Sequence, residues 1–94
     1  MSKEVTEKNR ELFIRMSIII STNRKLKGWS QEELAELVGV SRSLISAIEA
    51  PRLAYNFTLD VFFNIADALG IPPGLLIQEA SKNTFCQDVE KNNL

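Results

Sequence analysis

The chain of 94 residues is 45% hydrophobic and 24% charged, and 11 basic and 12 acidic side chains give a net charge of -1. This length suits one small domain with a single core, and the composition is that of a soluble globular protein, not of a disordered one. No run approaches the roughly 18 apolar residues of a membrane span, and we expect no secretory signal after Met1. A charge near zero, taken alone, argues against binding to nucleic acid.

The chain contains no histidine and one cysteine, Cys86. Without histidine there is no Ser-His-Asp triad, no Cys-His pair and no histidine zinc site. A single cysteine cannot form an intramolecular disulfide and suits a reducing, cytoplasmic setting. Asp60 and Asp67 could share one helix face, but no partner suggests acid–base chemistry. We therefore expect no enzyme, no cofactor and no metal site.

Apolar residues recur at spacings of three and four, which predicts an all-α bundle of about five helices. The first helix is expected over residues 12–27 and could start as early as a cap at Thr6. Its main stripe consists of Leu12, Met16, Ile19, Asn23 and Leu26. Further apolar residues lie on other sides, namely Phe13, Ile14, Ile18 and Ile20. Such a helix is either deeply buried or has two partners.

The next two helices are short and well delimited. Ser30 and Glu33 form a capping box that opens the second helix, which runs to Val38. Gly39 occupies the left-handed position that ends a helix, and Ser41 caps a third helix over residues 42–49. The apolar positions of the two helices are expected to face the core: Leu34, Ala35, Val38, Leu44, Ile45 and Ile48.

After a loop at residues 52–57, Thr58 is expected to cap a fourth helix over residues 59–69, and Pro72-Pro73 opens a short fifth helix. The inward residues are Leu59, Phe62, Phe63, Ile65, Ala66 and Leu69, followed by Leu75, Leu76 and Ile77. Beyond Gln78 the sequence is polar. We divide the chain into an N-terminal extension at 1–11 that can lengthen the first helix, a folded domain at 12–79 and a polar tail at 80–94.

The segment from Ser30 to Glu49 has the spacing of a helix-turn-helix, with Gly39-Val40-Ser41 as the turn. Small Ala35 permits a close approach of the third helix, whose outer side presents Arg42, Ser43 and Ser46, with Ala47 between them. An α-helix fits the major groove, where arginine and serine reach base edges. Any helical hairpin with a tight turn has this spacing, but the polar outer side favours DNA binding.

The string WSQEELAELVGVSRSLISAIE resembles the helix-turn-helix of the lambda-repressor-like family, the Cro and phage-repressor type also called Xre. The resemblance extends from about Ile18 through TLDVFFNIADALGI to PPGLLI. It implies a compact bundle of five helices that binds operator DNA, usually as a symmetric dimer. The loop APRLAYNF is about two residues longer than in the shortest members. Asn23 and Leu26 also depart from the family, which indicates a rotated or differently packed first helix.

The resemblance implies a role for eight residues at the DNA. Gln31 would contact a phosphate, and Arg42 and Ser43 would read bases, although Arg42 could instead clamp a phosphate. Ser46 and Ala47 would face the major groove. Ser41 would both cap the third helix and contact a phosphate. Arg52 and Asn56 lie in the loop that approaches the DNA backbone in this family. Arg24 and Glu49 match a structural ion pair between the first helix and the end of the third.

We expect a sequence-specific DNA-binding regulator that acts as a repressor. Its third helix, residues 42–49, would read the major groove of double-stranded DNA, and the protein would bind as a homodimer. The dimer would use the first helix, its extension, or the fifth helix with the tail; alternatively, the extension folds back on its own core. Two other functions stay open, an antitoxin that also binds a toxin and a protein-interaction module that has lost DNA binding. Residues 10–52 carry seven bases and five acids, whereas residues 53–94 carry two bases and five acids. This asymmetry is compatible with a DNA face on the first half.

Overall fold

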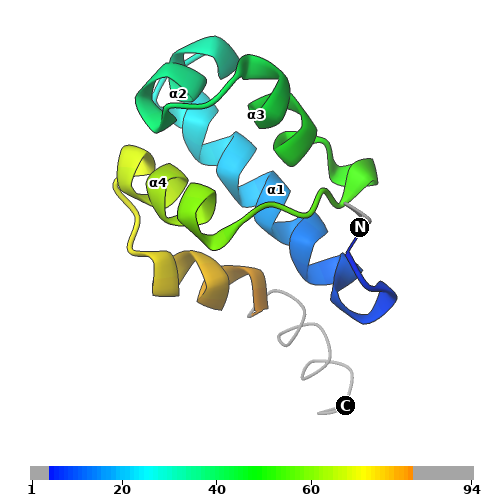
Figure 1. Ribbon diagram of the computed structural model, residues 1–94. Coiled ribbons are helices and arrows are strands. Elements are labelled where there is room, and N and C mark those ends of the chain that lie inside the picture. Colours follow the sequence, from blue (N-terminus) through cyan, green and yellow to red (C-terminus); the bar gives the residue numbers. More distant parts are fainter. Residues whose placement is uncertain (1–4, 82–94) are drawn as a thin grey trace.

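The computed structural model describes residues 5–81, and this part of the chain is helical, as predicted. The elements in order are the 3-10 helix η1 (Glu7–Asn9), α1 (Arg10–Leu26), α2 (Gln31–Val38), α3 (Arg42–Glu49), the 3-10 helix η2 (Pro51–Leu53), α4 (Leu59–Leu69) and a fifth α-helix (Pro73–Ser81). Figure 1 shows α1 crossing the whole bundle, with α2 and α3 gathered at the end where α1 finishes. The all-α bundle of five helices is therefore confirmed for the described residues.

The core lies where all five α-helices meet. Its fully buried large side chains are Ile20, Leu34, Ile45, Ile48, Ile65 and Leu76. Side-chain caps fix where three helices begin: the capping box of Ser30 and Glu33 opens α2, the Ser41 hydroxyl accepts from the Leu44 N–H, and the Thr58 hydroxyl accepts from the Val61 N–H. These predicted starts are confirmed, and α2, α3 and α4 each contribute their apolar face to the core.

Two predictions about α1 are wrong. The buried line is Met16, Ser17, Ile20 and Arg24. The predicted stripe is right at Met16, and Leu12 and Ile19 pack half-buried against the core, but it fails at Leu26, which is 79% exposed. The helix is rotated from the predicted stripe because Arg24 must turn inward to reach Glu49 on α3. Thr6 does not cap α1 either. It precedes η1, and its hydroxyl accepts a hydrogen bond from the Asn9 side chain at 3.1 Å.

α4 and the fifth helix bury fewer apolar residues than the sequence predicted. Leu59, Phe63, Leu75 and Ile77 are exposed, because the helical period turns only part of each apolar set toward the rest of the bundle. The fifth helix also continues beyond Glu79, where we expected the tail to begin, and Ala80 is fully buried in the core. The remainder of the predicted tail, with Cys86, lies outside the described residues.

Within residues 5–81, no single helix has the length and apolar composition needed to cross a membrane. α4 and the fifth helix would meet that requirement only as a pair, and they are bent by 99° relative to each other.

Candidate nucleic-acid interface

The turn between α2 and α3 is built around Gly39. This residue has φ +85° and donates its N–H to the Ala35 carbonyl at 2.8 Å, while the Val40 N–H donates to the same carbonyl at 3.0 Å. A left-handed residue at this point reverses the chain within three residues, which glycine does without steric strain. Ala35 is buried, and Val40 packs against the core. The geometry is that of a helix-turn-helix.

The outer face of α3 is polar and open. Ile45 and Ile48 are buried beneath it, whereas Arg42, Ser43 and Ser46 are exposed and Ala47 is half-buried. Ser41 is exposed as well, and its hydroxyl is used as the helix cap, 3.1 Å from the Leu44 nitrogen. The five residues predicted for the start and outer side of α3 therefore lie on one short, firmly held helix.

Beside α3, a buried ion pair links three segments. Arg24 donates to both carboxylate oxygens of Glu49, through Nε at 2.8 Å and Nη2 at 3.0 Å, and through Nη1 to the Trp29 carbonyl at 2.6 Å. Arg24 is 7% exposed and Glu49 is 6% exposed. The pair thus ties α1 to the end of α3 and to the segment that enters α2.

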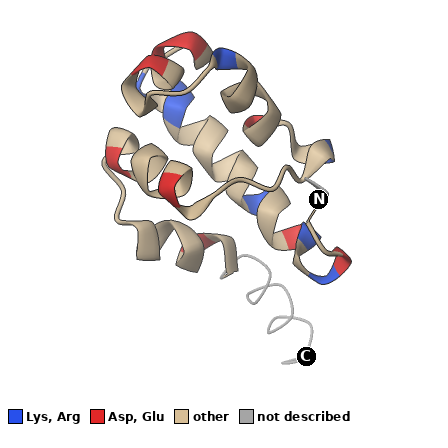
Figure 2. Cartoon of the chain, in the orientation of Figure 1, with Lys and Arg blue, Asp and Glu red and all other residues tan. Residues whose placement is uncertain are grey.

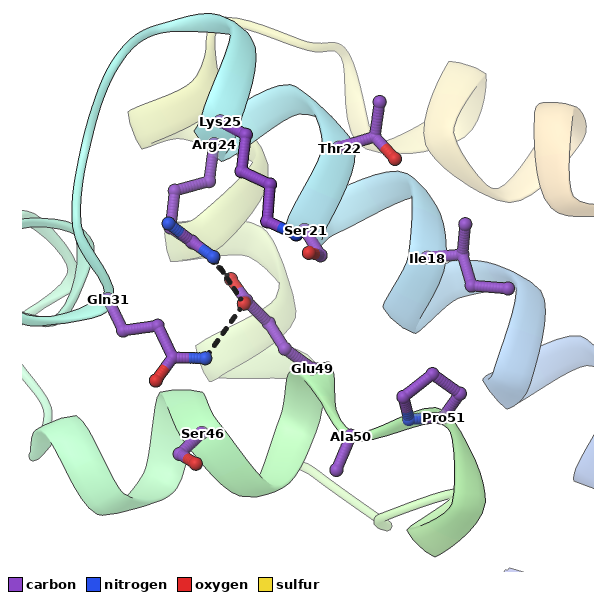
Figure 3. A pocket seen from close by; sticks show the side chains of 10 residues that line it. All are labelled: Ile18, Ser21, Thr22, Arg24, Lys25, Gln31, Ser46, Glu49, Ala50 and Pro51. Atoms are coloured by element: carbon purple, nitrogen blue, oxygen red, sulfur yellow. Dashed lines mark hydrogen bonds and ion pairs between the residues drawn. The ribbon is translucent and has the colours of Figure 1, made fainter.

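Gln31, at the start of α2, takes part in the same network. Its Nε2 donates to Glu49 Oε1 at 3.0 Å, and the side chain is half-buried (Figure 3). Sequence reasoning placed Gln31 at a phosphate but missed this bond, because the two residues are 18 positions apart and no local pattern joins them. The bond fixes the direction in which the amide points.

A cavity of about 490 Å³ opens over this network between α1, α2 and α3. Figure 3 shows that its lining comes from the last turns of α1, from Gln31, and from α3 with the segment after it. The polar residues besides the network are Ser21, Thr22, Lys25 and Ser46. Three of these four, Ser21, Thr22 and Lys25, were not predicted as functional residues.

Arg52 and Asn56 are separated within their loop. Both are exposed, but Arg52 lies in η2, where its carbonyl accepts a hydrogen bond from Arg10 Nη2 at 2.9 Å. Asn56 borders a cavity of about 240 Å³ together with Leu44 of α3. The structure therefore brings Asn56 beside α3 and ties the Arg52 backbone to the start of α1.

Charge is unevenly distributed over the described residues. Figure 2 shows acidic segments on α2 and α4 and basic segments along α1, at the start of α3 and after it. α2 carries three glutamates and no base, while α3 carries one exposed base and a glutamate that is buried and paired.

Among residues 5–81, no group of three His, Cys, Asp or Glu residues could hold a metal ion.

Comparisons with known proteins agree with this geometry. A family model described as helix-turn-helix matches residues 20–76. A hypothetical transcription factor of Neisseria meningitidis is 47% identical over 45 residues, which is 48% of this chain and 41% of that protein. An HTH-type transcriptional regulator of Methanothermobacter thermautotrophicus is 47% identical over 55 residues, 58% of this chain and 77% of that protein.

A solved structure shows the same architecture over most of the chain. The hypothetical transcription factor from Neisseria superposes with a TM-score of 0.66 at 33% sequence identity, covering 87% of this chain and 93% of that one. By sequence, however, this chain spans only about two fifths of the Neisseria meningitidis relative.

Proposed function

We propose that this chain, which belongs to the helix-turn-helix family of Cro and phage-repressor type, is a sequence-specific DNA-binding transcriptional regulator and acts as a repressor in the cytoplasm. Its DNA-binding domain comprises the predicted residues 12–79 together with the remainder of the fifth helix. The observation that carries the proposal is the exposed polar face of α3, held by buried Ile45 and Ile48 below it. A helix of this kind enters the major groove, where side chains discriminate between bases.

Within this proposal, Arg42 is the principal base reader, because it is exposed at the first position of α3 and its guanidinium can pair with two acceptors of guanine. Ser43 and Ser46 add hydrogen bonds and Ala47 an apolar contact. Gln31, Ser41 and Asn56 contact phosphates around α3 and position it. Arg52 contributes a more distant phosphate contact from η2, whose backbone is tied to Arg10.

We propose a homodimer, with half-sites about one helical turn apart. Apolar side chains on α4 and the fifth helix support this assembly, since Leu59, Phe63, Leu75 and Ile77 are all at least 40% exposed. Light scattering at micromolar concentration tests it, and a monomer at that concentration would contradict it.

A selection of bound duplexes from a genomic library, at low salt, tests the main proposal. The wild-type protein is expected to enrich one sequence. Arg42→Ala is expected to lose the preference at one base position, whereas Gln31→Ala weakens binding to all sequences to a similar extent. Retained preference in Arg42→Ala would remove this residue from base reading. Failure of the wild type to enrich any sequence would favour the protein-interaction module.

A further inference from the structure

We propose that the start of α1 braces the loop between α3 and α4, with Arg10 as a positioning residue for Arg52. This inference rests on the proposed function and goes beyond it, because Arg10 acts on the interface without touching DNA. The connection is long-range: Arg10 Nη2 donates to the Arg52 carbonyl at 2.9 Å, across 42 positions of the sequence. η2, which contains Arg52, also packs against α1.

The loop at residues 50–58 has a backbone that needs support. Ala54, directly after η2, is left-handed with φ 44° and ψ 53°, and it is 1% exposed. No other non-glycine residue in the described part of the chain has a positive φ. A left-handed conformation is unfavourable for a residue with a Cβ, so it persists only where surrounding contacts hold it.

Two contacts from α1 hold the loop on either side of Ala54. Before it, Arg10 binds the Arg52 carbonyl. After it, the ring of Phe57 meets the ring of Phe13 edge to face, with centroids 5.5 Å apart and planes at 76°, which is a favourable geometry for an aromatic pair. Arg10 and Phe13 are three positions apart and therefore lie on the same side of α1.

The brace matters for DNA because it fixes a base before binding. The Arg52 side chain is exposed, and a charge-assisted bond to its own carbonyl sets the place from which that side chain reaches out. A loop that is ordered in the free protein does not have to be ordered on binding. Without the bond, only a fraction of the molecules would present Arg52 correctly, and the apparent affinity would fall by that fraction.

Trypsin tests the brace in the absence of DNA. This protease cleaves after arginine and lysine by attack on their carbonyl, and the Arg52 carbonyl is the group that Arg10 holds. Arg10→Met is expected to speed the initial cleavage after Arg52 about fivefold, the effect of one modest hydrogen bond on local opening. Cleavage after Lys27, in the exposed turn that follows α1, should keep its rate. Lys8→Met, which removes an exposed base two residues earlier, should change neither rate.

A double-variant comparison tests the effect on DNA. Binding to a fluorescent duplex that contains the selected sequence is measured by anisotropy at several salt concentrations. Arg52→Ala is expected to lower the slope of log K against log salt by about 0.9 per protein copy, as for one lost phosphate contact. Arg10→Met is expected to weaken the wild type by up to about fivefold but to have almost no effect on the Arg52→Ala background. Lys8→Met gives the size of a general charge effect.

Urea unfolding shows that each variant is folded, and Arg10→Met should keep nearly the wild-type midpoint, because a role in stability alone would lower it. Equal losses from Arg10→Met on both backgrounds would mean that Arg10 contacts DNA directly and would overturn its positioning role. No change in affinity in Arg52→Ala would overturn that role too. An unchanged cleavage rate after Arg52 would overturn the brace itself. These outcomes leave the proposed function intact, whereas a wild type that binds no duplex would overturn the proposed function even if trypsin confirmed the brace.

Discussion

Removing the Glu49 carboxylate is expected to destabilise the domain more than any exposed charge change. Glu49 accepts two hydrogen bonds from Arg24 and one from Gln31, and both charged side chains are buried. Glu49→Ala leaves the guanidinium without its counter-charge, although the bond to the Trp29 carbonyl remains. Breaking one partner of a buried pair typically lowers the free energy of unfolding by about 3–5 kcal/mol. We expect about 3 kcal/mol here, near the lower limit, because of that remaining bond.

Such a loss is a large part of the total, since a unit of this size has a free energy of unfolding on the order of 4–12 kcal/mol. Urea unfolding at 25 °C followed by circular dichroism measures it. The matched control is Glu11→Ala, because Glu11 pairs with Arg15 at 3.1 Å but its side chain is 60% exposed, so the expected loss is below about 0.5 kcal/mol.

The double variant Arg24→Met/Glu49→Leu separates the cost of an unpaired charge from the loss of packing. Replacing a buried pair by apolar residues of similar size is often neutral or stabilising, so we expect the double variant to recover most of the stability. A Glu49→Ala variant within about 1 kcal/mol of the wild type would refute the reasoning, because the buried guanidinium would then need no partner.

Three further predictions concern the fold, and each is checked by the same urea unfolding. At both Gly39 and Gly74, an added methyl group meets no atom within 4 Å, so the two positions differ only in backbone conformation. Gly39→Ala should lower the free energy of unfolding by about 1 kcal/mol because φ is +85°, whereas Gly74→Ala should be neutral or stabilising. Ser30→Ala should lower the free energy of unfolding by about 1 kcal/mol, because the Glu33 N–H then loses its acceptor, and Glu33→Ala should add a smaller loss on that background, because its carboxylate accepts from the N–H of residue 30, which alanine retains. Ala80→Asp should lower the free energy of unfolding by about 3 kcal/mol because it places a charge in the core, whereas Ser81→Asp, at an exposed position, should change it very little. Equal effects of the two changes would show that the end of the fifth helix is not part of the core.

The parts of the fold that local chemistry determines could be predicted from the sequence. Ser30, Ser41 and Thr58 each accept a hydrogen bond from a backbone N–H three residues later, so the cap and its helix lie within one short string. The turn at Gly39 is local in the same way. The helix-turn-helix could therefore be predicted from short local patterns, namely the helix caps and the glycine at the turn.

The parts that depend on distant partners could not be predicted. α1 is apolar on several sides, and its rotation depends on the bond between Arg24 and Glu49, which are 25 positions apart. Sequence reasoning named that pair but did not use it to orient the helix. The bond from Gln31 to the same carboxylate has no local signal. Ala80 was assigned to the tail because the sequence around it is polar, although its methyl group is buried in the core.

The net charge of -1 is compatible with DNA binding because of where the charges are neutralised. Arg24 and Glu49 cancel inside the protein, and Glu33 accepts from the Ser30 N–H as part of a cap. The acids of α4 lie on a different element from the candidate interface. Exposed bases, in contrast, remain at Arg42 in α3, at Arg52 in η2, and at Lys25 and Lys27 at the end of α1. So few cations imply weak non-specific binding, since each phosphate contact contributes separately to affinity and to its salt dependence. Specific binding must then depend on base contacts by α3 and on the doubling of contacts in a dimer.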